Sequence, residues 1–264
     1  MNSVKECKNR FEVLGDRLKT RFFDFVWLSF LTFIFVIPLL VWIIYCNYVL
    51  VPQITNENFL VMSLIVYGPY IPLGMVFGLG ITGGLYFCKR LAFQEGSNVT
   101  PDLFYGLRKN IGHSLLIFFL LFLFYSLLKI GSLIATYSLS QVSAAILIGF
   151  LYIAFFIFFL ILSFVLTQTI IYKGTFAQFF LNSIKFTFGM FGWNLLILVV
   201  VLFPFLCYEF IPFSVAQYIA LAISMLFYLG FSLFVFTLYS HSIFDITLNQ
   251  DYPEIYRKGL TKEE

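Results

Sequence analysis

The segment Leu115–Leu128 reads LLIFFLLFLFYSLL and contains neither a charged residue nor an alternation of apolar and polar side chains. A strand of an outer-membrane barrel would show that alternation over about ten residues, so the segment predicts a helix. The rest of the chain is similar: of 264 residues, 61% are hydrophobic and 11% are charged. A soluble domain carries about 25% charged residues. The composition therefore predicts an all-α fold, a polytopic helical membrane protein whose first partner is the lipid bilayer.

The number of spans follows from the apolar runs, because a helix needs about 20 mostly apolar residues to cross a bilayer. The chain has six such runs: Phe25–Tyr45, Pro72–Leu91, Ser114–Tyr137, Val142–Tyr172, Trp193–Phe210 and Phe213–Ser240. A further apolar stretch, Phe59–Tyr70, is too short to span, and Pro69 and Pro72 at its end disfavour helix. We interpret it as a half-helix or re-entrant segment leading into the second span; a seventh span is the alternative.

Positive charge is distributed unevenly about these spans. Of the 16 lysines and arginines, all but Lys129 lie before the first span, between spans two and three, between spans four and five, or after the sixth. Because segments rich in Lys and Arg stay in the cytoplasm, both termini are predicted to be cytoplasmic. The single domain 1–264 then comprises a cytoplasmic amphipathic N-terminus (1–24), a transmembrane bundle (25–240) and a cytoplasmic tail (241–264).

The loop between spans two and three contains a predicted helix that lies on the membrane. Thr100, Pro101 and Asp102 form a helix start with Thr100 as the N-cap. Apolar residues then recur at helical spacing among basic ones, a pattern that favours the headgroup region. Similar amphipathic segments precede spans one and five. The sequence therefore predicts three units, each an interfacial helix followed by a two-span hairpin; chance self-similarity of apolar sequence is the alternative.

Glycines recur four residues apart along the second span, at Gly74 and Gly78 and again at Gly80 and Gly84. This spacing leaves a groove on one helix face that another helix backbone can approach closely. We predict helix packing at these glycines, with Gly78 and Gly84 in contact with a neighbouring helix and Phe77 facing lipid. The alternative is that the glycines line a narrow substrate path.

Two charged residues, Lys129 and Glu209, are predicted to lie at similar depth, about 22 Å from the inner starts of their spans. Ionisable groups inside a membrane are costly and usually pair. We therefore predict that the two side chains face each other or line an outward-open polar cavity. Separate snorkelling of each to the outer interface is the alternative. A disulfide between Cys46 and Cys207, also toward the outer side, is conceivable.

Enzymatic motifs are not evident. The sequence shows no cluster of His, Cys and carboxylates, no phosphate-binding glycine loop followed by lysine, and no nucleophile elbow. We therefore predict no catalytic, metal-binding or cofactor-binding residues, and a protein that is not an enzyme. The net charge of +3 reflects topology, and no nucleic acid is expected as a partner.

A family pattern begins at the glycine-bearing second span and continues through the loop after it. The residues that carry it are Tyr86, Lys89, Arg90, Glu95, Gly96, Asp102, Phe104, Gly106, Arg108, Lys109 and Asn110. Together they resemble the YesL family of bacterial multi-pass membrane proteins, mainly over residues 17–116. Members are often encoded beside ABC-type carbohydrate importers. The resemblance therefore implies an accessory or scaffold role in a membrane transport system such as carbohydrate uptake, with other transporter subunits as partners.

The same resemblance implies that the functional cytoplasmic loop contains Glu95, Asp102, Phe104, Arg108 and Asn110. A second hypothesis is a small-molecule-binding transport subunit with an outward-facing site. Aromatic and polar residues do gather on the predicted outer side: Tyr45, Asn47, Tyr48, Gln53, Tyr137, Gln141, Tyr208, Glu209 and Gln217. Because aromatic residues also form belts at membrane interfaces, the sequence leaves this hypothesis open.

Overall fold

The computed structural model describes residues 7–55, 57–210 and 214–260, and every regular element within those ranges is a helix. The longer helices are α1 (Arg10–Thr20), α2 (Phe22–Tyr45), α3 (Phe59–Tyr67), α4 (Tyr70–Ala92), α5 (Val99–Ser138), α6 (Gln141–Ile171), α7 (Phe176–Gly189), α8 (Phe191–Phe210), α9 (Ser214–Ile223) and α10 (Leu229–Thr247). Five helical segments are long and apolar enough to cross a membrane, and a sixth is obtained if one bent pair counts as a span. The chain is therefore an all-α polytopic membrane protein, as the sequence predicted.

The first two spans are longer than predicted. α2 continues through a π-helical turn and a 3-10 turn, so the first span covers Phe22–Gln53. α3 and α4 together form the second span, Phe59–Ala92. At their junction Gly68 and Pro69 both keep right-handed helical backbone angles, so α3 leads into α4 without turning back. The interpretation of Phe59–Tyr70 as a half-helix entering the second span is confirmed, and the re-entrant and seventh-span alternatives are wrong.

The third and fourth spans form the longest hairpin, because α5 has 40 residues and α6 has 31. α5 consists of two helices that meet at a kink at Asn110, where the backbone is not helical. The part after the kink, residues 111–138, is long enough at 1.5 Å per residue to cross a hydrocarbon core of about 30 Å. The predicted interfacial helix and the third span are thus two helices joined at Asn110.

The fifth predicted span is approached through a sharp bend. α7 and the first part of α8 meet at 99°, and Met190 between them has a non-helical backbone. α7 begins with a capping box in which the side chains of Thr175 and Gln178 each accept a backbone N–H of the other residue. The last candidate span covers Ile219–Thr247, the end of α9 together with α10.

A single residue breaks the chain between each amphipathic helix and the span after it. The backbone angles φ and ψ are −132° and 27° at Arg21, −113° and 16° at Asn110, and −127° and 39° at Met190. The three breaks have nearly the same non-helical conformation, and a long helical hairpin follows each. The structure therefore repeats an order of helix, break and hairpin three times, which supports the three-unit interpretation of the sequence.

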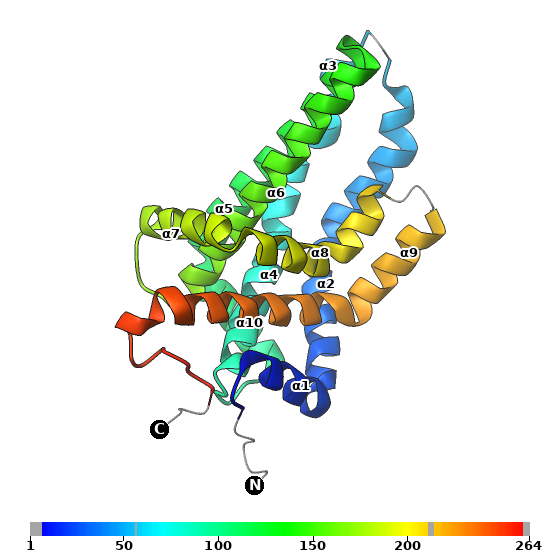
Figure 1. The fold of residues 1–264 in the computed structure, drawn as a ribbon. Helices are drawn as coiled ribbons and strands as arrows, with labels where there is room; N and C mark the ends of the chain where they lie inside the picture. The colour runs from blue at the N-terminus through cyan, green and yellow to red at the C-terminus, as the bar shows by residue number, and fades with distance from the viewer. Residues whose placement is uncertain (1–6, 56, 211–213, 261–264) are drawn as a thin grey trace.

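The hairpin of α5 and α6 rises away from the end of the molecule at which α1 and the segment after α10 lie (Figure 1). In this view α10 crosses α2 and α4 (Figure 1), and it packs against both. Glycines make the crossing close: a Cβ atom at Gly230 would lie 2.5 Å from the carbonyl oxygen of Phe25. At this crossing the backbone N–H of Gly230 donates to the side-chain oxygen Oγ of Ser29 at 2.7 Å, and this hydrogen bond joins α10 to α2.

Candidate functional site

The loop that follows α4 is organised around Arg90. The Arg90 guanidinium pairs with the buried carboxylate of Asp102 and lies 3.5 Å from a carboxylate oxygen of Glu95. The second oxygen of Asp102 accepts the backbone N–H of Asn98 at 2.9 Å. Asn98 is the N-cap of α5, so the prediction of Thr100 as N-cap was wrong. Thr100 Oγ1 instead accepts a hydrogen bond from the Trp27 indole N–H at 2.9 Å.

The segment that follows α10, called the tail from here on, contacts this loop. Lys258 Nζ contacts Glu95 Oε1 at 2.8 Å and lies 4.9 Å from the centre of the Phe93 ring. The Gln94 side-chain amide donates to the carbonyl oxygen of Gly259 at 3.0 Å. Burial acts to raise the pKa of Glu95, but the hydrogen bond and charge of Lys258, together with neighbouring cations, outweigh it and hold the pKa below its usual value. Charged contacts therefore fasten the tail to the loop.

Only a glycine fits at the docking point of the tail. Gly259 has φ of +83°, a left-handed conformation that side chains with a Cβ rarely adopt. A Cβ atom there would also lie 2.3 Å from the carbonyl oxygen of Ala92. The backbone of the tail thus lies directly on the end of α4. This close approach is a feature that the sequence analysis missed.

The N-terminal helix joins the same network. Arg10 Nη2 contacts Asp245 Oδ2 at 2.7 Å, and Arg10 Nη1 donates to the carbonyl oxygen of Lys258 at 3.0 Å. Asp245 also accepts the backbone N–H of Arg257 at 3.1 Å and the side-chain amide of Asn249 at 2.7 Å. α1, α10 and the tail are therefore held together by hydrogen bonds between groups far apart in the sequence.

The five loop residues singled out in the sequence fall into two groups. Glu95 and Asp102 contact Arg90, and Asn110 is buried at the break in α5, where its side-chain amide donates to the carbonyl oxygen of Gly106 at 2.9 Å. Phe104 and Arg108, by contrast, are exposed, and so is Tyr105 between them. The first group shapes the loop, and the second group is presented on its surface.

The second-span glycines lie against other helices. A Cβ atom at Gly74 would lie 2.1 Å from the Phe122 ring, and one at Gly78 would lie 2.1 Å from the Phe118 ring, both on α5. The other two glycines face different helices: Gly80 contacts Phe35 of α2, and Gly84 contacts Leu233 of α10. Through these four glycines α4 packs closely against three helices, α5, α2 and α10.

The position of Phe77 differs from the prediction. Its ring is half-buried between α4 and α5 and lies 5.9 Å from the Phe118 ring, edge to face. Phe77 therefore packs against α5 and is turned only in part toward lipid, which corrects the expectation of a lipid-facing ring, because large rings from α5 fill the groove left by the glycines. Val76, with 37% of its surface exposed, is the residue that faces outward here.

Lys129 is placed among aromatic side chains. Its Nζ lies 3.4 Å from the Tyr152 hydroxyl oxygen and 5.6 Å from the centre of the Tyr125 ring. The side chain of Glu209 lies outside the described residues, so the proposed pairing with Lys129 stays a prediction. Cys46 and Cys207 are not bridged by a disulfide.

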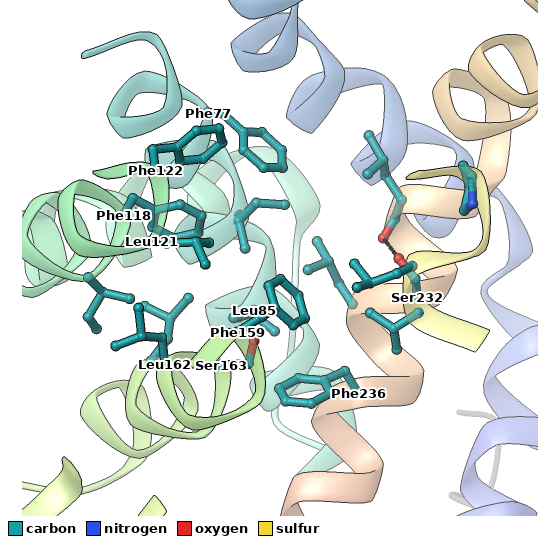
Figure 2. A pocket seen from close by; sticks show the side chains of 18 of the residues that line it. Phe77, Leu85, Phe118, Leu121, Phe122, Phe159, Leu162, Ser163, Ser232 and Phe236 are labelled. Atoms are coloured by element: carbon teal, nitrogen blue, oxygen red, sulfur yellow. Dashed lines mark hydrogen bonds between the residues drawn. The ribbon is translucent and has the colours of Figure 1, made fainter. Parts of the chain in front are cut away.

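A cavity of about 240 Å³ lies inside the bundle, between α4, α5, α6, α8 and α10. Rings from α4 and α5 approach it from one side and α10 closes the other (Figure 2). The labelled residues around it are Phe77, Leu85, Phe118, Leu121, Phe122, Phe159, Leu162, Ser163, Ser232 and Phe236 (Figure 2). This cavity could not be predicted from the sequence, because its lining residues come from five helices that only the fold brings together.

The residues of the outward-facing hypothesis whose side chains the structure describes do not line this cavity. Tyr45, Tyr48 and Tyr137 are exposed, whereas the side chains of Tyr208, Glu209 and Gln217 lie outside the described residues. Among the residues that the structure describes, no three His, Cys, Asp or Glu side chains are grouped as metal ligands. The cavity and the charged end of the bundle are therefore the two places where function is best sought.

Comparisons with known proteins identify no relative: no family model, no curated protein and no solved structure matches the chain.

Proposed function

We propose that this chain is an accessory or scaffold subunit of a membrane transport system, with both termini in the cytoplasm and the bundle in the bacterial cell membrane. The concentration of lysines and arginines at one side of the predicted spans supports that orientation. The resemblance of residues 17–116 to the YesL family supports a link to transport, and carbohydrate uptake is the class of transport it favours.

The observation that carries the proposal is an exposed strip on a firmly held helix. The strip consists of Phe104, Tyr105 and Arg108, and the two aromatic residues are 44% and 55% exposed. Aromatic residues and arginine are the types most enriched where proteins bind one another. Because Arg90 and Asp102 fix the start of α5, the strip is presented in one orientation, and binding to a partner subunit requires little ordering.

A photo-crosslinking amino acid at Tyr105 tests the proposal in intact cells. The proposal expects a covalent adduct to a subunit of a transport complex, identified by mass spectrometry, and loss of that adduct when Arg108 is changed to Glu. The matched control carries the same amino acid at Ile153, which is 59% exposed on α6, and should give adducts to lipid. Adducts to lipid alone at Tyr105 would mean that the strip lies in the headgroup region and binds no subunit.

A further inference from the structure

The interior cavity has a closed end and an open end. Leu85, Ile117 and Leu162 are each at most 3% exposed and close it on one side. Phe77 and Tyr228, on α4 and in the π-helical turn before α10, also line it but are only half-buried. The cavity therefore opens at the level of Phe77 and is closed at the level of Leu85.

The depth of the cavity follows from the position of its lining along α4. Leu85 is seven residues and Phe77 is fifteen residues before the end of α4 at Ala92. At 1.5 Å per residue these positions lie at most about 10 Å and about 22 Å from that end. The hydrocarbon core of a bilayer is about 30 Å thick. The open end thus lies at the level of lipid tails.

The open end is continuous with surface that faces lipid. Val76 precedes Phe77 and is 37% exposed, and Phe203 precedes the lining residue Pro204 and is 53% exposed. Both belong to helices whose apolar length crosses or enters the membrane. A molecule that enters the cavity therefore comes from the hydrocarbon layer, in which acyl chains are the main component.

The lining has little unused polar capacity. Ser224 Oγ donates to the carbonyl oxygen of Ala220 at 2.7 Å, and Ser232 Oγ donates to that of Leu229 at 3.0 Å (Figure 2). The Tyr228 hydroxyl donates to a backbone carbonyl of α8. None of the described lining residues is charged. Apart from the hydroxyls of Ser163 and Tyr125, the surface left for a ligand consists of methyl, methylene and aromatic ring groups, which favour hydrocarbon over a polar molecule.

We propose that this cavity binds a segment of the acyl chain of a membrane phospholipid, which enters laterally beside Phe77 while the headgroup stays outside. The volume is sufficient: an engineered apolar cavity of about 150 Å³ binds benzene, and this one measures about 240 Å³. The bound chain packs between the α5–α6 hairpin and α10 and joins the second and third helical units. This inference is independent of the proposed docking of a transport subunit.

The test is retention of lipid by the protein purified in mild detergent, read by native mass spectrometry. Ser163 lines the cavity from α6, and Ser163→Phe fills it. The matched control is Ala154→Phe, on the exposed face of the same helix. Wild type and the control are expected to retain a phospholipid, and Ser163→Phe to retain about tenfold less, equivalent to ~1.4 kcal/mol of binding. Equal retention by all three would overturn the proposal.

The mass of the retained molecule tests its identity, because a molecule without a fatty acyl chain would overturn the assignment. If Ser163→Phe does not fold, the proposal is tested on delipidated wild-type protein, by the effect of two added lipids on its unfolding temperature. Dipalmitoyl and dihexanoyl phosphatidylglycerol share a headgroup and differ in chain length. The proposal expects only the dipalmitoyl lipid to raise the unfolding temperature in detergent. An equal rise with both lipids would show that the headgroup is recognised elsewhere, and the cavity assignment would be wrong.

Discussion

Arg10 and Asp245 are separated by 235 positions in the chain and form an ion pair of 2.7 Å between Nη2 and Oδ2. Their side chains are only 9% and 11% exposed. Each is also hydrogen-bonded to the tail, Arg10 to the carbonyl oxygen of Lys258 and Asp245 to the N–H of Arg257. The pair therefore holds the first described helix against the last one.

Removing one partner of this pair is expected to destabilise the protein strongly. Arg10→Met leaves the Asp245 carboxylate buried without its counter-charge, a change that typically costs about 3–5 kcal/mol. The free energy of unfolding in detergent, followed by tryptophan fluorescence, measures the effect. Lys19→Met, on the exposed face of α1, is the control and should change it by less than about 0.5 kcal/mol. Similar small changes in both variants would show that the pair contributes little.

Side chains at the second-span glycines are expected to disrupt packing. Gly78→Leu collides with the Phe118 ring and Gly84→Leu with Leu233, and overpacking typically costs about 1–3 kcal/mol or more. Folded yield and unfolding temperature in detergent report the loss. Val76→Leu, on the outward face, should be tolerated. The prediction fails if Gly78→Leu is as stable as Val76→Leu.

Gly149 is a control for these variants, because it has room for a side chain and its substitution should not lower stability. Gly149 in α6 has no atom within 4 Å of an added Cβ. Gly149→Ala is therefore expected to be neutral or to stabilise the helix by up to about 1 kcal/mol. A loss of stability there would mean that alanine is unfavourable for reasons other than contact.

Protonation of Glu95 is expected to loosen the tail at acidic pH. The pKa of Glu95 is lower in the folded chain than its usual value of 4.5, so the unfolded state binds the proton more tightly. The stabilisation that ionised Glu95 contributes is therefore complete above the pKa that Glu95 has in the unfolded chain. It is lost as the pH falls through the lower pKa that Glu95 has in the folded chain. The difference in unfolding temperature between wild type and Glu95→Gln should thus be present at neutral pH and vanish below that window. Glu254→Gln, at an exposed position, should show no such dependence.

The corner between α7 and α8 depends on one buried amide. Asn194 Nδ2 donates to the carbonyl oxygens of Phe186 and Thr187, both at 2.9 Å, and its Oδ1 accepts the Tyr239 hydroxyl at 2.7 Å. Asn194→Leu removes the partner of the Thr187 carbonyl and of the Tyr239 hydroxyl, whereas the Phe186 carbonyl keeps the Met190 N–H. We therefore expect a loss of about 3 kcal/mol, from about 1–3 kcal/mol for each buried unsatisfied group. Unfolding of the purified variant measures it. Trp193→Phe, at a site 65% exposed, should be nearly neutral, and an equally small effect of Asn194→Leu would contradict the prediction.

The orientation in the membrane is tested by cysteine labelling with a reagent that does not cross membranes. In a variant without the four native cysteines, Thr55→Cys should react in intact cells and Lys109→Cys only after permeabilisation. Both positions are exposed in the fold, so a difference in reactivity reports the side of the membrane. Reaction of Lys109→Cys in intact cells would overturn the cytoplasmic assignment of the loop.

The composition was sufficient to predict the fold class. Local sequence patterns predicted helix junctions and helix caps less accurately. Apolar length located the spans because lipid requires it, but the same signal could not reveal that α3 and α4 form one span. The backbone at Gly68 and Pro69 stays helical despite the proline, since the first turn of α4 needs no N–H from Pro69. Residue type alone favours Thr100 as the N-cap, but in the structure Asn98 is the N-cap, and Asp102, which pairs with Arg90, accepts its backbone N–H.

The candidate site was less predictable than the spans. The sequence identified Glu95 and Asp102, but it gave no sign that Lys258 or Arg10 would join them, because those contacts connect distant segments. The positive φ of Gly259 likewise depends on the end of α4 beneath it. The cavity could not be predicted either, because an apolar residue that lines it has the same local pattern as one that fills a core.

The Arg10–Asp245 pair also has a consequence for how the protein is made. At about 5–20 residues per second, a ribosome produces Asp245 about 12–47 s after Arg10. During that interval α1 lacks its counter-ion, and the backbone carbonyl of Lys258, which accepts a hydrogen bond from Arg10, is made later still. A nascent chain that has not yet reached Asp245 therefore carries α1 without its counter-charge, and proteases can reach this helix before the pair forms.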